Sequence, residues 1–399
     1  MDKDFHYYGT FVAACLAGYN HKQAETIAHA AQYVDDSDSN RLIDQEKSGI
    51  GFEPIPTMQT HWEMVYKSNK KIRDVWVPFH FLPGNYKAEN LYKICTGIKL
   101  QDTTARTRMK DYNGVVELSH YDEPGVKVVD FVYDDNAKWE FKLMSLPKSL
   151  LITQLVNGLV EQAAMSGPYL PFGLLHSAGV MMHVLADTGA HMYYAGTPAM
   201  HVNEMGDVTD LDSKRKISFI FGSNPHFGRE PCSPPGLHAR SAVYLGHGRI
   251  GHVPDYPWLK YEYKPWWSQS PIVKDNPSDY LEIFKEMVTA LRCIKNGLPF
   301  DVLNLNHQLD DNTVSAVDQV LRQPHRFGLP YEEAVKIRCG FWEEAIVYGE
   351  FGNIVKPELY DPDLWVDKHN KTLNDLTSKT GVDLEKLRKT DYYAFQLTV

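Results

Sequence analysis

The sequence predicts a mainly α-helical protein, organised as a multi-helix bundle with one small inserted β-hairpin. Apolar segments at 150–165 and 171–194 are typical of long core helices. One stretch, 114–143, instead has the residue pattern and turn residues of strands. Amphipathic helical patterns fill the C-terminal third, at 280–295, 313–322, 331–348 and 384–395.

Length and composition support a folded body with two regions. The chain has 399 residues, of which 43% are hydrophobic and 23% charged, as is typical of a globular protein. We expect residues 1–270 to form a helical body that carries the functional site and the hairpin. We expect residues 271–399 to form helices that pack on the same body.

The first 36 residues predict two helices with a break at residues 18–20. An apolar stripe runs along the second helix, made of Ala24, Ile27, Ala31 and Val34. Asp35 lies four residues after Ala31 and therefore on the same side of that helix. The pattern predicts that Asp35, rather than Asp36, points inward.

The segments that connect these helices are more varied. The aromatic and apolar density of residues 75–81 predicts that His80 is buried. The other predicted connections are an irregular segment at 37–60, strands at 126–133 and 138–143 around a turn at 134–137, a loop-rich stretch at 196–235 and a short helix at 237–245.

The predicted helix at 171–194 carries the most informative pattern of the chain. His183, Asp187 and His191 are spaced at i, i+4 and i+8, so their side chains leave one face of the helix, and His176 falls on the same stripe. Imidazole and carboxylate are ligands that zinc prefers, and burying them without a metal or hydrogen-bond partners is costly. The alternative is a core helix whose polar side chains are hydrogen-bonded to neighbouring helices.

A second candidate region is the glycine- and proline-containing loop 246–258, which holds His247, His252 and Asp255. Loops of this kind carry functional residues more often than cores do. The alternative interpretation is a structural turn.

Charge and composition argue against several classes of function. With 51 acidic and 41 basic residues the formal net charge is −10, which repels nucleic acid and anionic membranes. Five widely spaced cysteines without a C-x-x-C pair argue against a disulfide scaffold or a cysteine zinc site. The N-terminus lacks the pattern of a signal peptide, and the apolar stretch 11–17 is too short to span a bilayer. We therefore expect a cytoplasmic protein.

The order of the candidate residues resembles two families. An early His, an Asp that ends the second helix, an aromatic-flanked His and the His-x3-Asp-x3-His run are similar to the zinc-dependent phospholipase C and single-strand nuclease superfamily, at His6, Asp35, His80, His183, Asp187 and His191. The chain also resembles, over most of its length, a family of unknown function that opens with Asp-Phe-His-Tyr-Tyr and contains Gln-Tyr-Val-Asp-Asp and Leu-Gly-His-Gly.

The first resemblance implies a phospholipase C-like helical bundle with three zinc ions and a bridging water that attacks a phosphodiester. In this chain the last His comes two residues earlier than in that superfamily, and no clean second His-x3-Asp pair follows. The superfamily's third zinc often binds the amine of a processed N-terminal Trp, whereas Asp2 should block the removal of Met1 here. We expect one or two zinc ions, or at most three, and iron or manganese would also suit these ligands.

These observations predict a metal-dependent hydrolase that acts on a small-molecule ester or phosphodiester through a metal-activated water. We expect His183, Asp187 and His191 to bind the metal directly, with Asp187 as the bridge if two metals are present. The remaining candidate ligands are His6, Asp35, His80, His247 and His252. Asp36 and Asp255 are candidates for a general base or acid.

Two alternatives remain open. One is a zinc-dependent lyase or ring-rearranging enzyme of specialised metabolism, of the fungal alkaloid type. The other is a non-catalytic helical protein with a structural metal, whose site would be saturated by four protein ligands. The sequence leaves the natural substrate and the oligomeric state undetermined.

Overall fold

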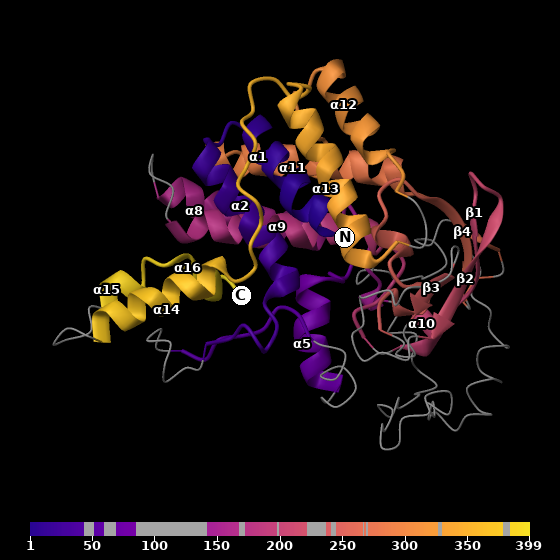
Figure 1. Cartoon of the computed structure of the whole chain (residues 1–399), viewed down its shortest axis with the longest axis horizontal. Coiled ribbons are helices and arrows are strands. Elements are labelled where there is room, and N and C mark those ends of the chain that lie inside the picture. The colour runs from indigo at the N-terminus through magenta and orange to yellow at the C-terminus, as the bar shows by residue number, and fades with distance from the viewer. Residues whose placement is uncertain are drawn as a thin grey trace.

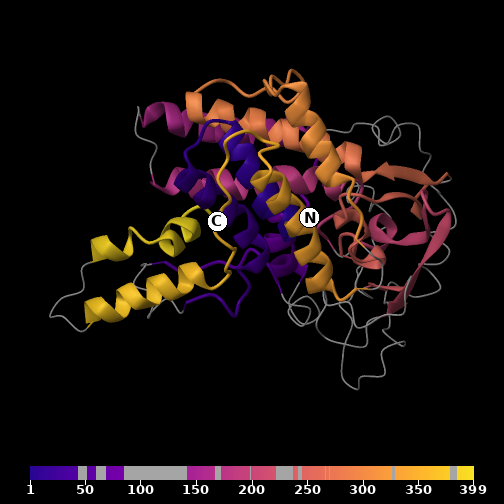
Figure 2. The same ribbon diagram turned by 45° about the horizontal axis from the view of Figure 1, so that its top comes forward.

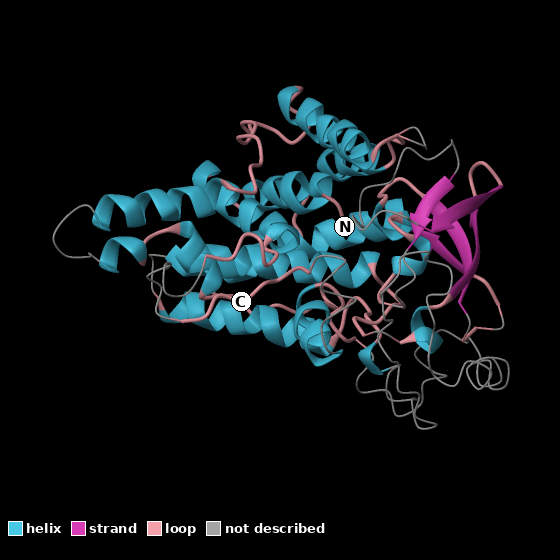
Figure 3. Cartoon of the chain, turned by 60° about the horizontal axis from the view of Figure 1, so that its bottom comes forward, coloured by secondary structure: helices cyan, strands magenta, loops and turns pink. Residues whose placement is uncertain are grey.

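The computed structural model is mainly helical, which confirms the predicted fold class at that level. Helices make up most of the molecule, and the strands gather at one end of it (Figure 3). The predicted hairpin at 114–143 lies almost wholly outside the described residues. The structure describes residues 1–43, 52–59, 69–84, 142–166, 172–197, 199–221, 237–240, 245–265, 267–268, 270–325, 329–377 and 384–399.

The chain begins with a π-helix, η1 (Asp4–Gly9), which continues directly into α1 (Thr10–Leu16). The second predicted helix is α2 (His21–Asp36), and Asn20 caps it by accepting a hydrogen bond from the backbone N–H of Gln23. The break between α1 and α2 falls where it was predicted, with Gly18 at φ +90°, a left-handed conformation that favours glycine.

Helix α9 (Phe172–Ala190) lies at the centre of the helical body, in contact with α2, α8 (Leu150–Met165) and α11 (Asn276–Asn296). Gly179 allows the close approach of α9 to α2, because a Cβ at this position would overlap the Ile27 carbonyl oxygen and the Ala30 side chain. This contact brings the polar stripe of α9 directly against α2.

The C-terminal third folds largely as predicted. Helices α11, α12 (Asp311–Leu321) and α13 (Tyr331–Val347) confirm three of the expected segments. The segment expected at 384–395 instead forms two helices, α15 (Leu384–Leu387) and α16 (Asp391–Gln396), because Thr390 caps a new helix start. Helix α14 (Leu364–Thr377) was not predicted. Both ribbon views place α14, α15 and α16 at the end of the molecule opposite the sheet (Figures 1 and 2).

The sheet corrects two predictions, the loop-rich stretch at 196–235 and the short helix at 237–245. Residues 237–240 form a strand rather than a helix, and they pair in parallel with the preceding strand. These segments gain their structure from pairing with distant strands, which overrides local preference. Within the described residues the sheet has five strands: β1 (Met205–Asp210), β2 (Arg215–Phe221), β3 (Leu237–Arg240), β4 (Lys260–Pro265) and β5 (Ile272–Asp275). They lie in the order β3-β2-β1-β4-β5. Neighbouring strands pair antiparallel except β2 and β3, which pair in parallel.

Two of the clusters of buried side chains adjoin α9, one along its length and the other just beyond its C-terminal end. The larger contains Phe11, Met182, Leu291 and Trp342, so residues from both predicted regions share one core. The second cluster lies under the sheet and includes residues that follow α9, among them Tyr194. Two further helices are α5 (Asn69–Phe79) and the single-turn α10 (Met200–Asn203). Within the described ranges, no helix combines the length and apolar character needed to cross a membrane.

Candidate metal centre

Helix α9 presents the polar stripe that its sequence predicted. His183 Nε2 and His191 Nδ1 lie 3.2 and 3.5 Å from Asp187 Oδ2, and all three residues are buried. His176, on the same stripe, lies elsewhere: its ring contacts Asp391 and the carbonyl of Phe172. The stripe therefore divides into a three-residue site and a separate contact with α16.

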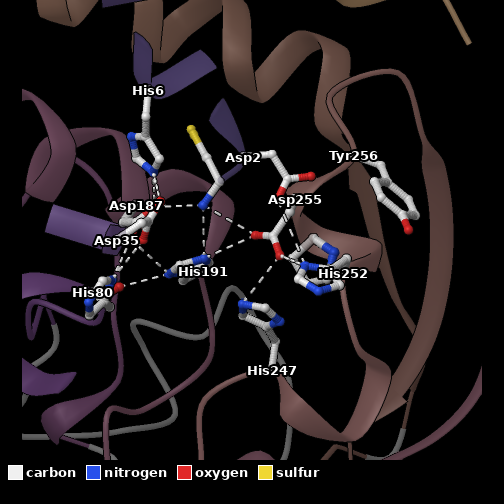
Figure 4. A network of polar contacts seen from close by, with 12 residues as sticks. Asp2, His6, Asp35, His80, Asp187, His191, His247, His252, Asp255 and Tyr256 are labelled. Atoms are coloured by element: carbon white, nitrogen blue, oxygen red, sulfur yellow. Dashed lines mark hydrogen bonds and ion pairs between the residues drawn. The ribbon is translucent and has the colours of Figure 1, made fainter. Parts of the chain in front are cut away.

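Three further predicted residues reach this stripe from other elements and form what we call the helix end of the centre, made of His6, Asp35, His80 and His183. His6 Nε2 lies 3.2 Å from Asp187 Oδ1, and His80 Nδ1 lies 3.4 Å from Asp187 Oδ2. Asp35 lies 3.7–3.9 Å from His6, His80 and His183. Figure 4 shows His6, Asp35 and His80 gathered around Asp187.

The second predicted region supplies the loop end of the centre, made of His247, His252 and Asp255. It lies on two turns, η3 (Gly248–Ile250) and η4 (Val253–Asp255). Asp255 joins this end to the stripe, with its Oδ1 3.2 Å from His191 Nε2 and its Oδ2 3.0 Å from His252 Nδ1. His247 Nε2 lies 3.7 Å from Asp255 Oδ2. Figure 4 shows this group on the opposite side of His191 from His6.

A glycine fixes the entry to this loop. Gly246 has φ +53°, and a Cβ here would overlap the Phe81 ring. Phe81 stacks on His191 with ring centroids 4.6 Å apart and also lies near His247. The glycine of the Leu-Gly-His-Gly motif therefore lets one aromatic ring support a histidine of α9 and a histidine of the loop.

The Met1 amine lies between the two ends and was not predicted as part of the site. Its nitrogen is 2.9 Å from Asp187 Oδ1, 3.3 Å from Asp255 Oδ1 and 3.4 Å from His191 Nε2. Burial alone would lower the pKa of this amine, but the carboxylates of Asp187, Asp255 and Asp35 outweigh burial and hold the pKa at about 12. The amine is therefore a buried cation.

In four histidines of the centre, a hydrogen bond to a backbone carbonyl fixes which ring nitrogen carries the hydrogen. A carbonyl oxygen only accepts, so each ring nitrogen that contacts one carries the hydrogen, and the other ring nitrogen presents its lone pair to the centre. The outer contacts are His80 Nε2 to Thr57, His183 Nδ1 to Ala31, His191 Nδ1 to His80 and His247 Nδ1 to Gly251, at 2.7–2.8 Å.

Asp187 and His6 have strongly shifted pKa values. The pKa of Asp187 is well below its usual range, because His191, the Met1 amine, His183 and His6 outweigh the effect of burial. Burial, with His183 and the amine next to it, lowers the pKa of His6 far below its usual value. In the described part of the chain neither ring nitrogen of His6 has a hydrogen-bond partner, and Asp187 Oδ2 has none.

Asp36, a candidate general base, lies apart from both ends. Its Oδ2 accepts hydrogen bonds from the Tyr360 hydroxyl at 2.8 Å and from the Gln32 side chain at 3.0 Å. The structure brings together the other predicted residues and adds Asp2 and the Met1 amine. One signal for Asp2 was available, since it precedes His6 by four residues, the spacing of one helical turn.

Comparison with known proteins gives a family and no activity. A family model described as "Family of unknown function (DUF6765)" matches residues 1–399. No curated protein and no solved structure matches the chain. The expected resemblance to a family of unknown function is thus confirmed, and the resemblance to the phospholipase C superfamily receives no support from these comparisons.

Proposed function

The chain belongs to this family of unknown function, and from its metal centre we propose that it is a metal-dependent hydrolase of small-molecule esters or phosphodiesters. The proposal includes a zinc centre like that of the phospholipase C and single-strand nuclease superfamily, whose order of ligands the sequence resembles.

One contact carries the proposal. His80 Nδ1 and His183 Nε2 lie 3.2 Å apart, and the opposite nitrogen of each ring donates to a backbone carbonyl. With both rings neutral, two lone pairs face each other at this distance, which is unfavourable unless a cation lies between them. Burial lowers the pKa of His183 to about 4, so the His183 ring itself is neutral at neutral pH. A divalent metal satisfies both nitrogens and the unpartnered Asp187 Oδ2.

The residues of each end would have separate tasks. At the helix end two groups could hold a metal, His6 with Asp35 and His183, and His80 with His183 and Asp187. At the loop end the groups are His191 with His247 and Asp255, and Asp2 with His252 and Asp255. Asp187 lies against the helix end and the Met1 amine, which makes it the residue that couples the two ends. A bound divalent metal would lower the pKa of its water to roughly 7 and so supply a nucleophile at neutral pH.

The Asp255–His252 pair is the best candidate for moving a proton. Because the Asp255 carboxylate stays ionised, it accepts from His252 Nδ1 at 3.0 Å, and neutral His252 then carries its lone pair on Nε2. His252 keeps 23% of its side chain exposed, more than the other histidines of the centre. A substrate that reaches the loop end would therefore meet a general base.

The charge of the chain favours small substrates over polyanions. The formal net charge of −10 opposes the approach of nucleic acid, whereas one ester or phosphodiester group needs only local contacts. A small-molecule substrate is therefore part of the proposal.

Metal analysis tests the centre first. We expect zinc to copurify with the wild-type chain, and His183→Ala to lose it. His176→Ala is the matched control, because it makes the same substitution on the same helix outside the centre, and it should keep the metal. Absence of bound metal in wild-type protein never exposed to chelator would overturn the proposal.

Turnover tests the chemistry. We expect the zinc-loaded protein to hydrolyse bis(para-nitrophenyl) phosphate or para-nitrophenyl acetate, with loss of activity in chelator and in His183→Ala but not in His176→Ala. Stoichiometric metal without turnover of any ester would contradict the hydrolase. Turnover of a carbonyl substrate by a lyase reaction would then favour the alternative enzyme class.

A further inference from the structure

The first residues of the chain are unusually well buried. Met1 is 6% and Asp2 3% exposed, although the ends of a chain are normally mobile unless other elements hold them. In Figure 4, Asp2 lies beside the loop end, next to Asp255 and His252. Something must hold this segment in place against the centre.

Helix α13 and its first residue provide that hold. Arg338, 2% exposed, donates to Asp2 Oδ2 and, through Nε at 3.2 Å, to Asp4 Oδ1. Tyr331 donates its hydroxyl hydrogen to Asp2 Oδ1 at 2.7 Å. The two residues therefore occupy both carboxylate oxygens of Asp2, and we call them the N-terminal anchor. The forked guanidinium suits this task because it binds two carboxylates at fixed angles.

The hold passes from Asp2 to ligands of the centre through the backbone. The carbonyl oxygen of Asp2 accepts from the N–H groups of Phe5 and His6, each at 3.0 Å. On its other side Asp2 is bonded to Met1, whose amine lies between Asp187 and Asp255. A displacement of Asp2 would therefore shift the amine and the His6 ring together.

The same anchor also supports the loop end. The Tyr331 ring stacks on His252 with centroids 4.6 Å apart and an interplanar angle of 29°. Arg338 NH1 lies 3.2 Å from His325 Nδ1, which also accepts from the Trp258 indole at 3.0 Å. Trp258 follows Asp255 by three residues, so the anchor reaches the loop from both the N-terminus and α13.

We propose that Arg338 and Tyr331 are positioning residues of the metal centre, which fix Asp2 and His252 and thereby set metal affinity at the loop end. The inference rests on the proposed metal centre. Neither residue ligates the metal. The helix end is affected less, because His6 is held through Asp2 whereas His80 and His183 are held by the carbonyl groups of Thr57 and Ala31.

Tyr331→Phe is the most specific test, because it removes one hydrogen bond to Asp2 and keeps the ring that stacks on His252. Cobalt is titrated into the metal-free protein while its visible absorption is recorded, since that spectrum reports the coordination of each ion. We expect the cobalt site at the loop end to lose roughly 10-fold or more in affinity in Tyr331→Phe and to change its spectrum, as losses of supporting residues do. Cobalt at the helix end should lose less affinity.

Tyr8→Phe is the matched control. Tyr8 lies on η1 and donates its hydroxyl hydrogen to Glu343 of α13, so this variant also loses one hydrogen bond between η1 and α13, away from Asp2. Its cobalt spectrum should match that of the wild type. Arg338→Lys keeps the charge without the fork and should recover part of the affinity that Arg338→Met loses, with thermal unfolding confirming that each variant folds.

The outcomes separate this inference from the proposed function. Wild-type protein that binds no cobalt overturns the metal centre and the anchor with it. Wild-type protein that binds cobalt, with Tyr331→Phe and Arg338→Lys indistinguishable from it in affinity and spectrum, overturns the anchor alone. Equal loss in Tyr331→Phe and Tyr8→Phe also overturns it, because the effect would then be general loosening of η1.

Discussion

The two ends of the candidate metal centre are built in different ways. The helix end collects side chains from η1, α2, the residue after α5, and α9, and its three histidines are at most 3% exposed. The loop end places His247, His252 and Asp255 within nine consecutive residues, and its two histidines are 17% and 23% exposed. Helix packing thus holds one end, whereas turns and the N-terminal anchor hold the other.

The difference indicates a division of labour. Burial and backbone hydrogen bonds keep the helix-end histidines preorganised, which favours a tightly held metal. Partial exposure on a loop favours exchange with solvent and access for a substrate. We therefore expect the helix end to bind metal more tightly and the loop end to bind the substrate.

Asp187→Asn should have the largest effect, because Asp187 contacts the helix end and pairs with the Met1 amine. Leaving that ammonium without its closest carboxylate should destabilise the metal-free protein by about 3–5 kcal/mol, the cost of breaking a buried ion pair. Activity should fall by at least about 100-fold. Urea unfolding in chelator and metal analysis measure both effects. Retention of both metals in this variant would show that the ends are independent of Asp187.

Removing one histidine at a time should separate the metal affinities of the two ends. His183→Ala should release the tightly held metal, whereas His252→Ala should weaken only the exchangeable one, by about 10–100-fold, and lower the rate. Competition with a chelating dye measures the affinities. Equal losses at both ends in either variant would mean that the centre binds its metals as one unit.

Gly246→Ala should damage the loop end alone. The new Cβ would overlap the Phe81 ring, and the alanine would have to keep the left-handed backbone conformation of Gly246. Together these should lower the free energy of unfolding by about 1–3 kcal/mol. Gly158→Ala is the control, because nothing lies within 4 Å of its added Cβ on α8, and it should stabilise by about 0.5–1 kcal/mol. Thermal unfolding gives the stabilities. Unchanged metal affinity at the loop end in Gly246→Ala would remove the role assigned to this glycine.

A change of pH should distinguish the two ends least, since burial lowers the pKa of His183 at one end and of His247 at the other to about 4. In the metal-free protein burial lowers the pKa of five described histidines, His307 among them, and it does so most strongly for the four buried ones, namely His6, His29, His183 and His247. Each stays neutral when folded and takes up a proton on unfolding, so its stabilising effect is full above pH 6.5 and is lost as pH falls. Three carboxyl groups with raised pKa values act in the opposite direction, namely Asp4, Asp35 and Glu286.

The lowered histidine pKa values outnumber the raised carboxyl pKa values, so unfolding takes up protons on balance between about pH 4.5 and pH 6. Stability of the metal-free protein should therefore rise with pH in this range. Urea unfolding in chelator across the range measures the slope. A stability that falls with rising pH would contradict the protonation states assigned to the centre.

The helix end was predictable because its information is periodic. The i, i+4, i+8 spacing of His183, Asp187 and His191 needs only helix geometry, and the apolar stripe of α2 directed Asp35, rather than Asp36, toward the centre. The loop end was predictable only as a composition of ligand types. The Met1 amine had no side-chain signature at all, because a backbone group enters a site through tertiary packing alone.

The same distinction explains the fold. Helices α2, α8 and α11 carry local patterns and caps, and α9 carries a local pattern, which the sequence displays directly. Strand β1 has no regular alternation and contains a register shift between Met205 and Val208, so its pairing with β2 and β4 decides its structure. Strand β4 alternates buried tyrosines with more exposed residues, a pattern that was present and overlooked.

The ion pair between Asp2 and Arg338 also has a consequence for synthesis of the chain, since the two residues are 336 positions apart. At ~5–20 residues per second, a ribosome adds Arg338 roughly 20–70 s after Asp2. During that interval the N-terminal residues exist without the guanidinium that will hold them. If the proposed anchor positions the loop end, a nascent chain stopped before Arg338 should take up metal poorly at that end.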